Sequence, residues 1–421
     1  MPESGFVYPN EVETQWSLLI VLYPYITGLV AGAFIVSSSY HVFGIASLKS
    51  VSRFSLVAAL AFLLVAPLPL QAHLGHPERA FNIFLMPHFT SAMAGFGYIW
   101  LFYTVLVVAE TWLSFRKDFV IAAQSNTGLK GRIYEALTLG IHDISEESEK
   151  ADEKIVKTLA LVGIPSAFLL HGYVGFIFGA IKANPWWSSP LMPVIFLMSA
   201  IVSGTALLIV LYVAVMKVRR LPVDRDCVNT MGLMLLGFLA MDLALEGLEL
   251  LQRFYEKDES WGIISKLITE RIPFTYFGLQ LGLGGLLPLV VLIYLSAVGG
   301  KIRARLPITV GISMLVLVGV FAMRWNVVIG GQLFSKSLRG LLTYNPPIFG
   351  QEGIVTAMAV LALPFAVFAV MAYFTRPWLD TVLTPVPAEG PGPSLPEAPR
   401  AAWHGWGERP SVGGIWDERR Q

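Results

Sequence analysis

Nine apolar stretches decide what this chain can fold into, because each is long enough to cross a bilayer as a helix of about 20 residues. They lie near residues 16–41, 53–72, 89–113, 155–181, 190–216, 229–252, 274–297, 306–329 and 353–375. Backbone polar groups inside a bilayer must be paired within the spanning structure, which favours helices. The sequence therefore predicts an all-α fold, a polytopic membrane helical bundle of about nine transmembrane helices, within a range of about eight to ten.

The composition agrees with a membrane protein and excludes several cofactors. Of the 421 residues, 55% are hydrophobic and only 14% are charged, and a water-soluble protein of this size needs more charge. The single cysteine, Cys227, excludes a disulfide within the chain, a CxxCH haem attachment and a cysteine-ligated iron–sulfur cluster. The expected environment is the lipid membrane, and no nucleic-acid partner is expected.

The distribution of basic residues predicts the orientation. If the N-terminus lies outside, 21 of the 30 Lys and Arg fall in inner loops and the C-terminal tail. This bias favours an N-out, C-in protein of a bacterial or archaeal inner (cytoplasmic) membrane. The chain then divides into an outer N-terminal segment (1–15), a transmembrane domain (16–376) and a flexible inner tail rich in Pro and Gly (377–421).

Four ionisable residues stand inside the predicted spans: His171, Asp242, Glu246 and Arg324. Ionisable groups cost free energy in lipid, so they are functional candidates. Asp242 and Glu246 are four residues apart and share one helix face. The predicted topology brings all four to similar depth, which indicates one polar site below the outer surface. A structural ion pair between Arg324 and a carboxylate, with His171 as an ordinary core residue, is the alternative.

A histidine and carboxylates beside an apolar cavity suit a hydroquinone, which needs a hydrogen-bond acceptor for each hydroxyl and a route for its protons. Two other functions stay open. A b-type haem anchor needs two facing histidines, and no such pair occupies one predicted helix. A proton- or solute-conducting transporter would fit the glycine-rich seventh span and the buried carboxylates. However, Glu110 lies at the end of a predicted span, so few acids remain for a continuous path to the inner side.

The loop after the second span holds an unusual run of polar residues, namely His73, His76, Glu78 and Arg79. Pro77 stiffens this turn, and Glu78 is placed to pair with Arg79. The loop is either a rigid connector or a lid over the outer site. His73, His76 and His88 have spacing that a metal site would allow, but the neighbouring charges and prolines favour a packed loop, so no metal is expected.

Three blocks of sequence resemble the NrfD/PsrC family, the quinone-interacting membrane subunits of polysulfide-reductase-type complexes. The first is LGHPER at 74–79, followed by PHFTSAM at 87–93. The family commonly has Arg where this chain has His76. The second is HGYVGF at 171–176 with PWW at 185–187, and the third is RWNVVIGGQ at 324–332. Length and the third block are most similar to the DsrP branch, the membrane subunits of DsrMKJOP complexes.

The resemblance implies a helical subunit that is not catalytic in isolation and has no haem or iron–sulfur cluster of its own. It would exchange electrons between a quinone, menaquinone or ubiquinone, and an outer-face ferredoxin-like iron–sulfur subunit. Further redox subunits, such as a cytochrome c, a haem b protein and a catalytic subunit of anaerobic respiration or sulfur metabolism, would complete the complex. The resemblance also implies that His171 and Asp242 contact the quinone hydroxyls, with Tyr173 nearby, while Glu246 and Arg324 handle protons or balance charge.

Overall fold

The computed structural model describes residues 4–8, 14–88, 90–257, 260–298 and 304–378. Within these ranges nine helical segments are long and apolar enough to cross a membrane. The predicted all-α bundle is therefore confirmed, and the chain is a multi-pass integral membrane protein. The long elements are α1 (Leu18–Phe43), α2 (Lys49–Val65), α5 (Ala92–Ser125), α7 (Glu146–Gly179), α8 (Met192–Val218), α9 (Arg225–Glu256), η4 (Phe274–Leu286) with α11 (Leu287–Val298), α12 (Arg305–Trp325) with η6 (Asn326–Gly330), and α13 (Ile354–Thr375).

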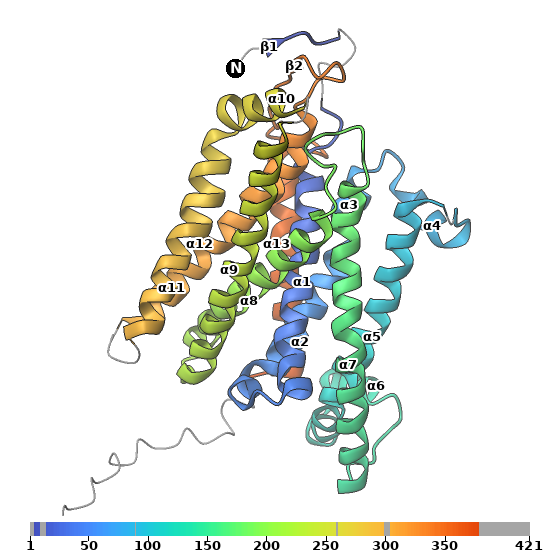
Figure 1. The fold of residues 1–421 in the computed structure, drawn as a ribbon. Coiled ribbons are helices and arrows are strands. Elements are labelled where there is room, and N and C mark those ends of the chain that lie inside the picture. The colour runs from blue at the N-terminus through green and yellow to red at the C-terminus, as the bar shows by residue number, and fades with distance from the viewer. Residues whose placement is uncertain (1–3, 9–13, 89, 258–259, 299–303, 379–421) are drawn as a thin grey trace, which may run out of the picture. The chain divides into compact units, whose positions relative to one another are not determined.

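Short elements gather at the two ends of the bundle (Figure 1). We call one end the strand end, because it holds β1 and β2, and the other the α6 end. The short elements are β1 (Ser4–Gly5), η1 (Ala46–Leu48), α3 (Leu68–His73), η2 (Pro77–Arg79), α4 (Asn82–Leu85), α6 (Gly128–Leu137), α10 (Trp261–Lys266), η3 (Leu267–Arg271) and β2 (Gly340–Leu341).

Helix α1 forms the core of the bundle. Every residue from Leu19 to Ser39 is buried, and the helix packs against α2, α7, α8, α12 and α13. Between apolar helices in lipid, small residues allow the close backbone approach that stabilises packing. At the crossing of α1 and α8, a Cβ added to Gly204 would lie 2.5 Å from the Cα of Gly32. This crossing requires glycine on both helices.

A second group of helices, α9, η4 with α11, and α12, packs beside α8. Here Gly284 of η4 and Gly319 of α12 make the close crossing. Both η4 and η6 are π-helical, and η4 keeps this wide turn for 13 residues. A π-helical turn shifts the register of side chains and is frequent at functional sites. It places Gln280 and Asn326 toward the same interior space.

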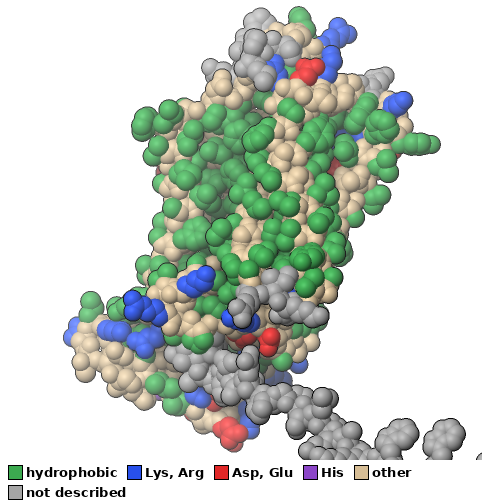
Figure 2. Space-filling model, turned by 90° about the vertical axis from the view of Figure 1, so that its left-hand side faces the viewer, with side chains coloured by type: hydrophobic (Ala, Val, Ile, Leu, Met, Phe, Trp, Pro, Cys, Tyr) green, Lys and Arg blue, Asp and Glu red, His purple; other side chains and the backbone are tan. Residues whose placement is uncertain are grey.

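Helices α5 and α7 extend beyond their predicted spans at the α6 end. The span predicted at 89–113 continues as helix to Ser125, and α7 begins at Glu146 rather than at 155. Arg116 holds the extensions together, because its guanidinium pairs with Asp152 at 2.6 Å and donates to the Asp143 carbonyl oxygen at 2.5 Å. Figure 2 shows a broad apolar band between two ends where charged side chains gather.

The N-terminal segment is tied to a distant loop at the strand end. Residues Ser4–Gly5 pair antiparallel with Gly340–Leu341, and the backbone N–H of Trp16 donates to Gln332 Oε1 at 2.7 Å. The predicted flexible tail, 377–421, lies outside the described residues apart from its first two positions. The tail and the orientation of the termini across the membrane stay predictions.

Candidate functional site

Arg324 of α12 is the centre of a fully buried polar cluster. Its Nη2 donates to Ser199 Oγ at 2.6 Å, to the Phe196 carbonyl oxygen at 3.2 Å and to His171 Nε2 at 3.2 Å. The guanidinium carbon also lies 3.9 Å from the centre of the Phe196 ring, a cation–π geometry. These contacts replace the hydration that the charge loses on burial. The predicted convergence of Arg324 and His171 is therefore seen in the structure.

The contact with Arg324 also fixes which nitrogen of His171 carries hydrogen. A guanidinium can only donate, so Nε2 of the histidine accepts and the neutral ring carries its proton on Nδ1. That Nδ1 has no hydrogen-bond partner among the described residues. His171 also packs against α1, where Gly28 leaves room for its ring. The ring is thus held between α1, α8 and α12 rather than open to a cavity.

A second polar chain joins α9, η4 and η6. Gln280 Nε2 donates to Glu246 Oε2 at 3.0 Å, and Asn326 Nδ2 donates to Gln280 Oε1 at 2.8 Å. The hydroxyl of Thr275 then donates to Asn326 Oδ1 at 2.6 Å. Every donor in this chain points toward the carboxylate of Glu246, which is therefore the acceptor at its end. The chain holds one Glu246 oxygen in place, since only Oε2 receives the amide.

Asp242 lies one helical turn along α9 from Glu246 and is 5% exposed. Its Oδ1 has no hydrogen-bond partner within the described ranges. Asp242 and Glu246 line one small space together with Ser199 and Gln280. The predicted shared face of the two carboxylates is present. Neither carboxylate forms an ion pair with Arg324 among the described contacts, so the structural-pair alternative is not what the geometry shows.

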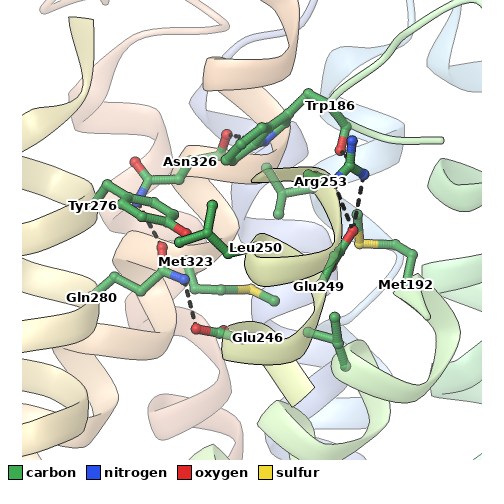
Figure 3. A pocket seen from close by; sticks show the side chains of 12 residues that line it. Trp186, Met192, Glu246, Glu249, Leu250, Arg253, Tyr276, Gln280, Met323 and Asn326 are labelled. Atoms are coloured by element: carbon green, nitrogen blue, oxygen red, sulfur yellow. Dashed lines mark hydrogen bonds and ion pairs between the residues drawn. The ribbon is translucent and has the colours of Figure 1, made fainter. Parts of the chain in front are cut away.

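A small, partly open pocket with a cavity volume of about 60 Å³ adjoins this polar chain. Figure 3 shows Glu246 and Gln280 at one side of the pocket and Trp186 with Asn326 at another. Tyr276 and Leu250 lie between them. The pocket is thus bounded by one carboxylate, amides and aromatic rings, which is the mixture typical of sites for small organic ligands.

The pocket is shaped by contacts from the loop between α7 and α8. Trp186 Nε1 donates to the Asn326 carbonyl oxygen at 3.0 Å, and Trp187 Nε1 donates to the Val327 carbonyl oxygen at 2.6 Å. These carbonyl groups belong to π-helical η6. Its widened turn leaves their oxygens free to accept from the two indole N–H groups. On the facing helix, Arg253 donates to the Pro185 carbonyl oxygen at 2.5 Å and pairs with Glu249 at 2.9 Å. The loop is therefore pinned from both sides.

A second, apolar groove lies next to the pocket and shares Leu250 with it. The groove has a volume of about 400 Å³. Its walls are mostly apolar side chains of α9, α10, η3 and η4, namely Leu250, Leu251, Phe254, Trp261, Ile268 and Phe277. A polar pocket and an apolar groove thus adjoin one another along α9.

The remaining predicted residues lie elsewhere. Tyr173 contacts Gly95 of α5 and packs on Phe176, with ring centres 5.3 Å apart, so it does not join the cluster around Arg324. His73 pairs with Glu352 at 2.7 Å, which ties the end of α3 to the segment just before α13.

Within that loop, His76 pairs with Glu78 at 3.0 Å. The expected pairing of Glu78 with Arg79 is not among the described contacts. His76 and Glu78 are both exposed, because they follow one another around a short 3₁₀ turn rather than packing on a helix. Whether the loop acts as a connector or a lid stays a prediction.

Glu110 was expected at the end of a span, and its place relative to the membrane boundary stays a prediction. It lies inside α5, is fully buried, and neither of its oxygens has a hydrogen-bond partner among the described residues. The apolar run ends near 113, whereas the helix continues to Ser125. Reasoning from the sequence also missed Gln280 and Tyr276, whose inward direction depends on the π-helical turn of η4.

The described histidines give no evidence of a paired axial-ligand arrangement. His171 is the one fully buried histidine of the described ranges, and its Nε2 is occupied by Arg324. Groups of three or more His, Cys, Asp or Glu that could hold a metal ion do not occur among the described residues.

The membrane helices of the described ranges enclose a buried arginine and a polar pocket near one end, which defines an integral membrane protein with an intramembrane site. A family model described as "Polysulphide reductase, NrfD" matches residues 8–336, which is more than half of the chain. The chain belongs to the NrfD family, as its sequence blocks predicted.

Three named relatives align with most of this chain. A relative from Mesobacillus selenatarsenatis, named as a subunit of selenate reductase, is 30% identical over 371 residues, 84% of each protein. A relative from Archaeoglobus fulgidus, named as a subunit of tetrathionate reductase, is 25% identical over 382 residues, 88% of this chain and 95% of the relative. The Hdr-like menaquinol oxidoreductase integral membrane subunit of the same organism is 25% identical over 372 residues, 84% of this chain and 83% of the relative. The narrower resemblance to the DsrP branch stays a prediction.

Proposed function

We propose that the chain is the membrane subunit of a multi-subunit oxidoreductase and exchanges electrons between the quinone pool and an iron–sulfur partner. The relatives support a subunit role, because two are named as reductase subunits and a third as a subunit of a menaquinol oxidoreductase. The pocket at Glu246 is the proposed quinone site. Menaquinone or ubiquinone is the substrate class, and electrons pass in either direction.

The observation that carries this proposal is the position of Glu246 between a polar chain and an apolar groove. Its Oε2 is held by Gln280, which leaves Oε1 for a ligand. A quinol hydroxyl donates to this oxygen, and the aromatic walls of Trp186 and Tyr276 hold the ring. The apolar groove beyond Leu250 takes the isoprenoid chain.

The chemistry needs places for two protons as well as two electrons. Oxidation of a quinol to a quinone releases both, and reduction takes up both. Glu246 accepts the first proton at its free oxygen. Asp242 lies one turn along the same face and has an oxygen without a partner in the described ranges, so it is placed to receive the proton from Glu246. The electrons leave to a partner, since one cysteine cannot ligate a cluster in this chain.

In this proposal Arg324 and His171 do not contact the quinone; they act on the residues that do. Arg324 adds a fixed positive charge to the same interior, which attracts the negative charge left on a carboxylate when its proton departs. His171 holds the guanidinium through Nε2. In this proposal Glu246 takes the hydroxyl contact that the resemblance implied for His171 and Asp242.

A binding measurement tests the site. The purified chain in lipid nanodiscs is titrated with a short-chain naphthoquinol, and quenching of tryptophan fluorescence reports occupancy. Glu246→Gln keeps the shape but removes the charged acceptor, and we expect about tenfold weaker binding, or ~1.4 kcal/mol. Glu149→Gln, an exposed substitution at the α6 end, is the matched control and keeps wild-type affinity. Equal affinity in wild type and Glu246→Gln contradicts the site.

A purification tests the subunit role. Tagged chain isolated from native membranes is expected to bring an iron–sulfur protein and bound quinone, with no haem assignable to this chain. A chain that purifies alone, without quinone, contradicts the role and favours a transporter. A haem spectrum from the isolated chain would favour the haem-anchor function instead.

Sulfur-compound metabolism is the proposed context of the complex. The family description names polysulphide and one relative is named for tetrathionate, which supports a sulfur compound as terminal substrate. The relative named for selenate reduction makes a selenium oxyanion the competing substrate. Turnover of the co-purified complex with tetrathionate, polysulfide and selenate in parallel decides between them.

A further inference from the structure

The most isolated ionisable group of the described structure lies far along the chain from the proposed quinone site. Glu110 of α5 is 0% exposed, and both carboxyl oxygens lack a hydrogen-bond partner in the described ranges. A buried carboxylate without a partner is costly, so the side chain must either carry its proton or bind water. The quinone proposal assigns no role to Glu110 or to any other residue of α5.

Two further polar groups occupy the same face of α5. Tyr103 is two turns from Glu110 toward the strand end, and Ser114 is one turn from it toward the α6 end, so the three side chains share one face. The buried hydroxyl oxygens of Tyr103 and Ser114 also lack partners among the described residues. These three polar groups therefore follow one another along a line of about 16 Å.

A fourth group comes from α1. Phe34 of α1 and Leu106 of α5 both lie against Gly163 of α7, so the three helices meet at this level. Ser38 and Glu110 are each four residues further along their own helices, which both run toward the α6 end. They therefore face the same seam between α1, α5 and α7. The hydroxyl of Ser38 is buried and also unpartnered within the described ranges.

The charged groups around α5 do not neutralise Glu110. On α2, Arg53 pairs with Asp118 and stacks on Phe115, while Lys49 lies at the helix start. The charges of α6 and of the first turns of α7 lie at the α6 end, and α13 contributes only Tyr373 as a titratable group. None of them forms a described ion pair or hydrogen bond with Glu110.

We propose that Glu110 is a second protonation site, whose carboxyl group exchanges its proton with water entering the α1–α5–α7 seam from the α6 end. Ser114 and Ser38 hydrogen-bond the water on that side, and Tyr103 bonds it on the other. Buried water that satisfies such groups is a regular part of protein interiors. The site is separate from Glu246 in sequence and in the helices that form it, and it requires no quinone.

Infrared spectroscopy of the full chain in nanodiscs tests the proposal. The protonated carboxyl of Glu110 gives a C=O stretching band that is absent in Glu110→Gln. Transfer from H₂O to D₂O is expected to shift this band within minutes, and Ser114→Ala is expected to slow the shift. Absence of the band overturns the proposal, because the group is then ionised. A band that does not shift over hours overturns it too, because the seam is then sealed.

Chemical labelling gives an independent readout. The O–H of a protonated carboxylic acid adds across one C=N bond of dicyclohexylcarbodiimide, and the adduct rearranges to a stable N-acylurea that mass spectrometry locates. We expect the adduct at Glu110 and none at exposed Glu149, and loss of the adduct in Glu110→Gln. Should that variant fail to fold, Glu110→Asp keeps the acid and shifts its band and labelling rate. Full labelling of Glu149 with none at Glu110 overturns the proposal. No quinone is present, so the result is independent of the Glu246 site.

Discussion

Arg324 and Glu110 are both ionisable, both fully buried and both inside membrane helices, yet their surroundings differ completely. Arg324 donates to three acceptors from α7 and α8 and lies on an aromatic ring. Glu110 has no partner among the described residues. The first group is fixed by its neighbours, and changing it disturbs several helices. Glu110 depends on water that enters the seam between α1, α5 and α7. It is therefore suited to proton exchange rather than to holding helices together.

Substitution of Arg324 is expected to give the largest change in stability, and it tests the contrast between the two residues directly. Arg324→Leu leaves His171 Nε2 without its donor, whereas Ser199 Oγ still donates to the Phe196 carbonyl oxygen at 3.0 Å. One unpaired buried group costs about 1–3 kcal/mol, and we expect a loss of stability of that size, seen as a lower midpoint of thermal unfolding in detergent. Arg132→Leu, an exposed arginine on α6, is the control, with a change within about 0.5 kcal/mol. Equal midpoints for Arg324→Leu and the control would show that the cluster does not stabilise the bundle.

The same kind of substitution at Glu110 is expected to act in the opposite direction. Glu110→Leu removes a buried group that lacks protein partners in the described ranges. The free energy of unfolding is therefore expected to stay unchanged or to rise by at most about 1 kcal/mol, and the thermal midpoint to stay unchanged or rise with it. Glu110→Gln keeps the unsatisfied polarity and provides the matched variant. A fall as large as that of Arg324→Leu would mean that Glu110 has a structural partner and would remove the contrast.

Tyr173 sharpens the comparison because it lies near His171 in sequence but faces another helix. Tyr173→Phe removes only the hydroxyl beside Gly95 of α5. Quinol affinity is expected to stay within about twofold of wild type. A tenfold loss in the same fluorescence titration would return Tyr173 to the site and would require a different pocket.

A carboxylate outside the membrane spans gives the smallest effect. The backbone N–H and hydroxyl of Ser145 hydrogen-bond to Asp143, and with Arg116 nearby they hold the pKa of this exposed carboxyl below its usual value. A lowered folded-state pKa contributes stability above the unfolded pKa of about 4, and this contribution is lost as pH falls through the folded value. Asp143→Asn is therefore expected to melt slightly lower than wild type at pH 7, with the difference vanishing in acid. A difference that persists at low pH contradicts the assignment.

Much of the fold follows from the sequence because apolar runs of about 20 residues are stable in lipid as membrane-spanning helices. The depth argument also brought Arg324 to His171 and Asp242 to Glu246. It could not identify Ser199 as an acceptor, since a serine in an apolar helix carries no pairing signal. Gln280 was missed because the π-helical turn of η4 changes which residues face inward. The length of α5 was underestimated because hydropathy marks the end of the apolar run, whereas Arg116 and its partners extend the helix beyond it.

The order of the helices along the chain has a consequence for biogenesis. Helix α1 is synthesised first, and the helices that bury it follow later. Because it is apolar along its length, lipid can solvate it until those helices have been inserted. Arg324 is the opposite case, because a guanidinium in lipid needs acceptors at once. Its acceptors belong to α7 and α8, which leave the ribosome earlier. The charged residue thus enters a membrane where its partners are already waiting, so insertion never passes through a stage with an unpaired arginine.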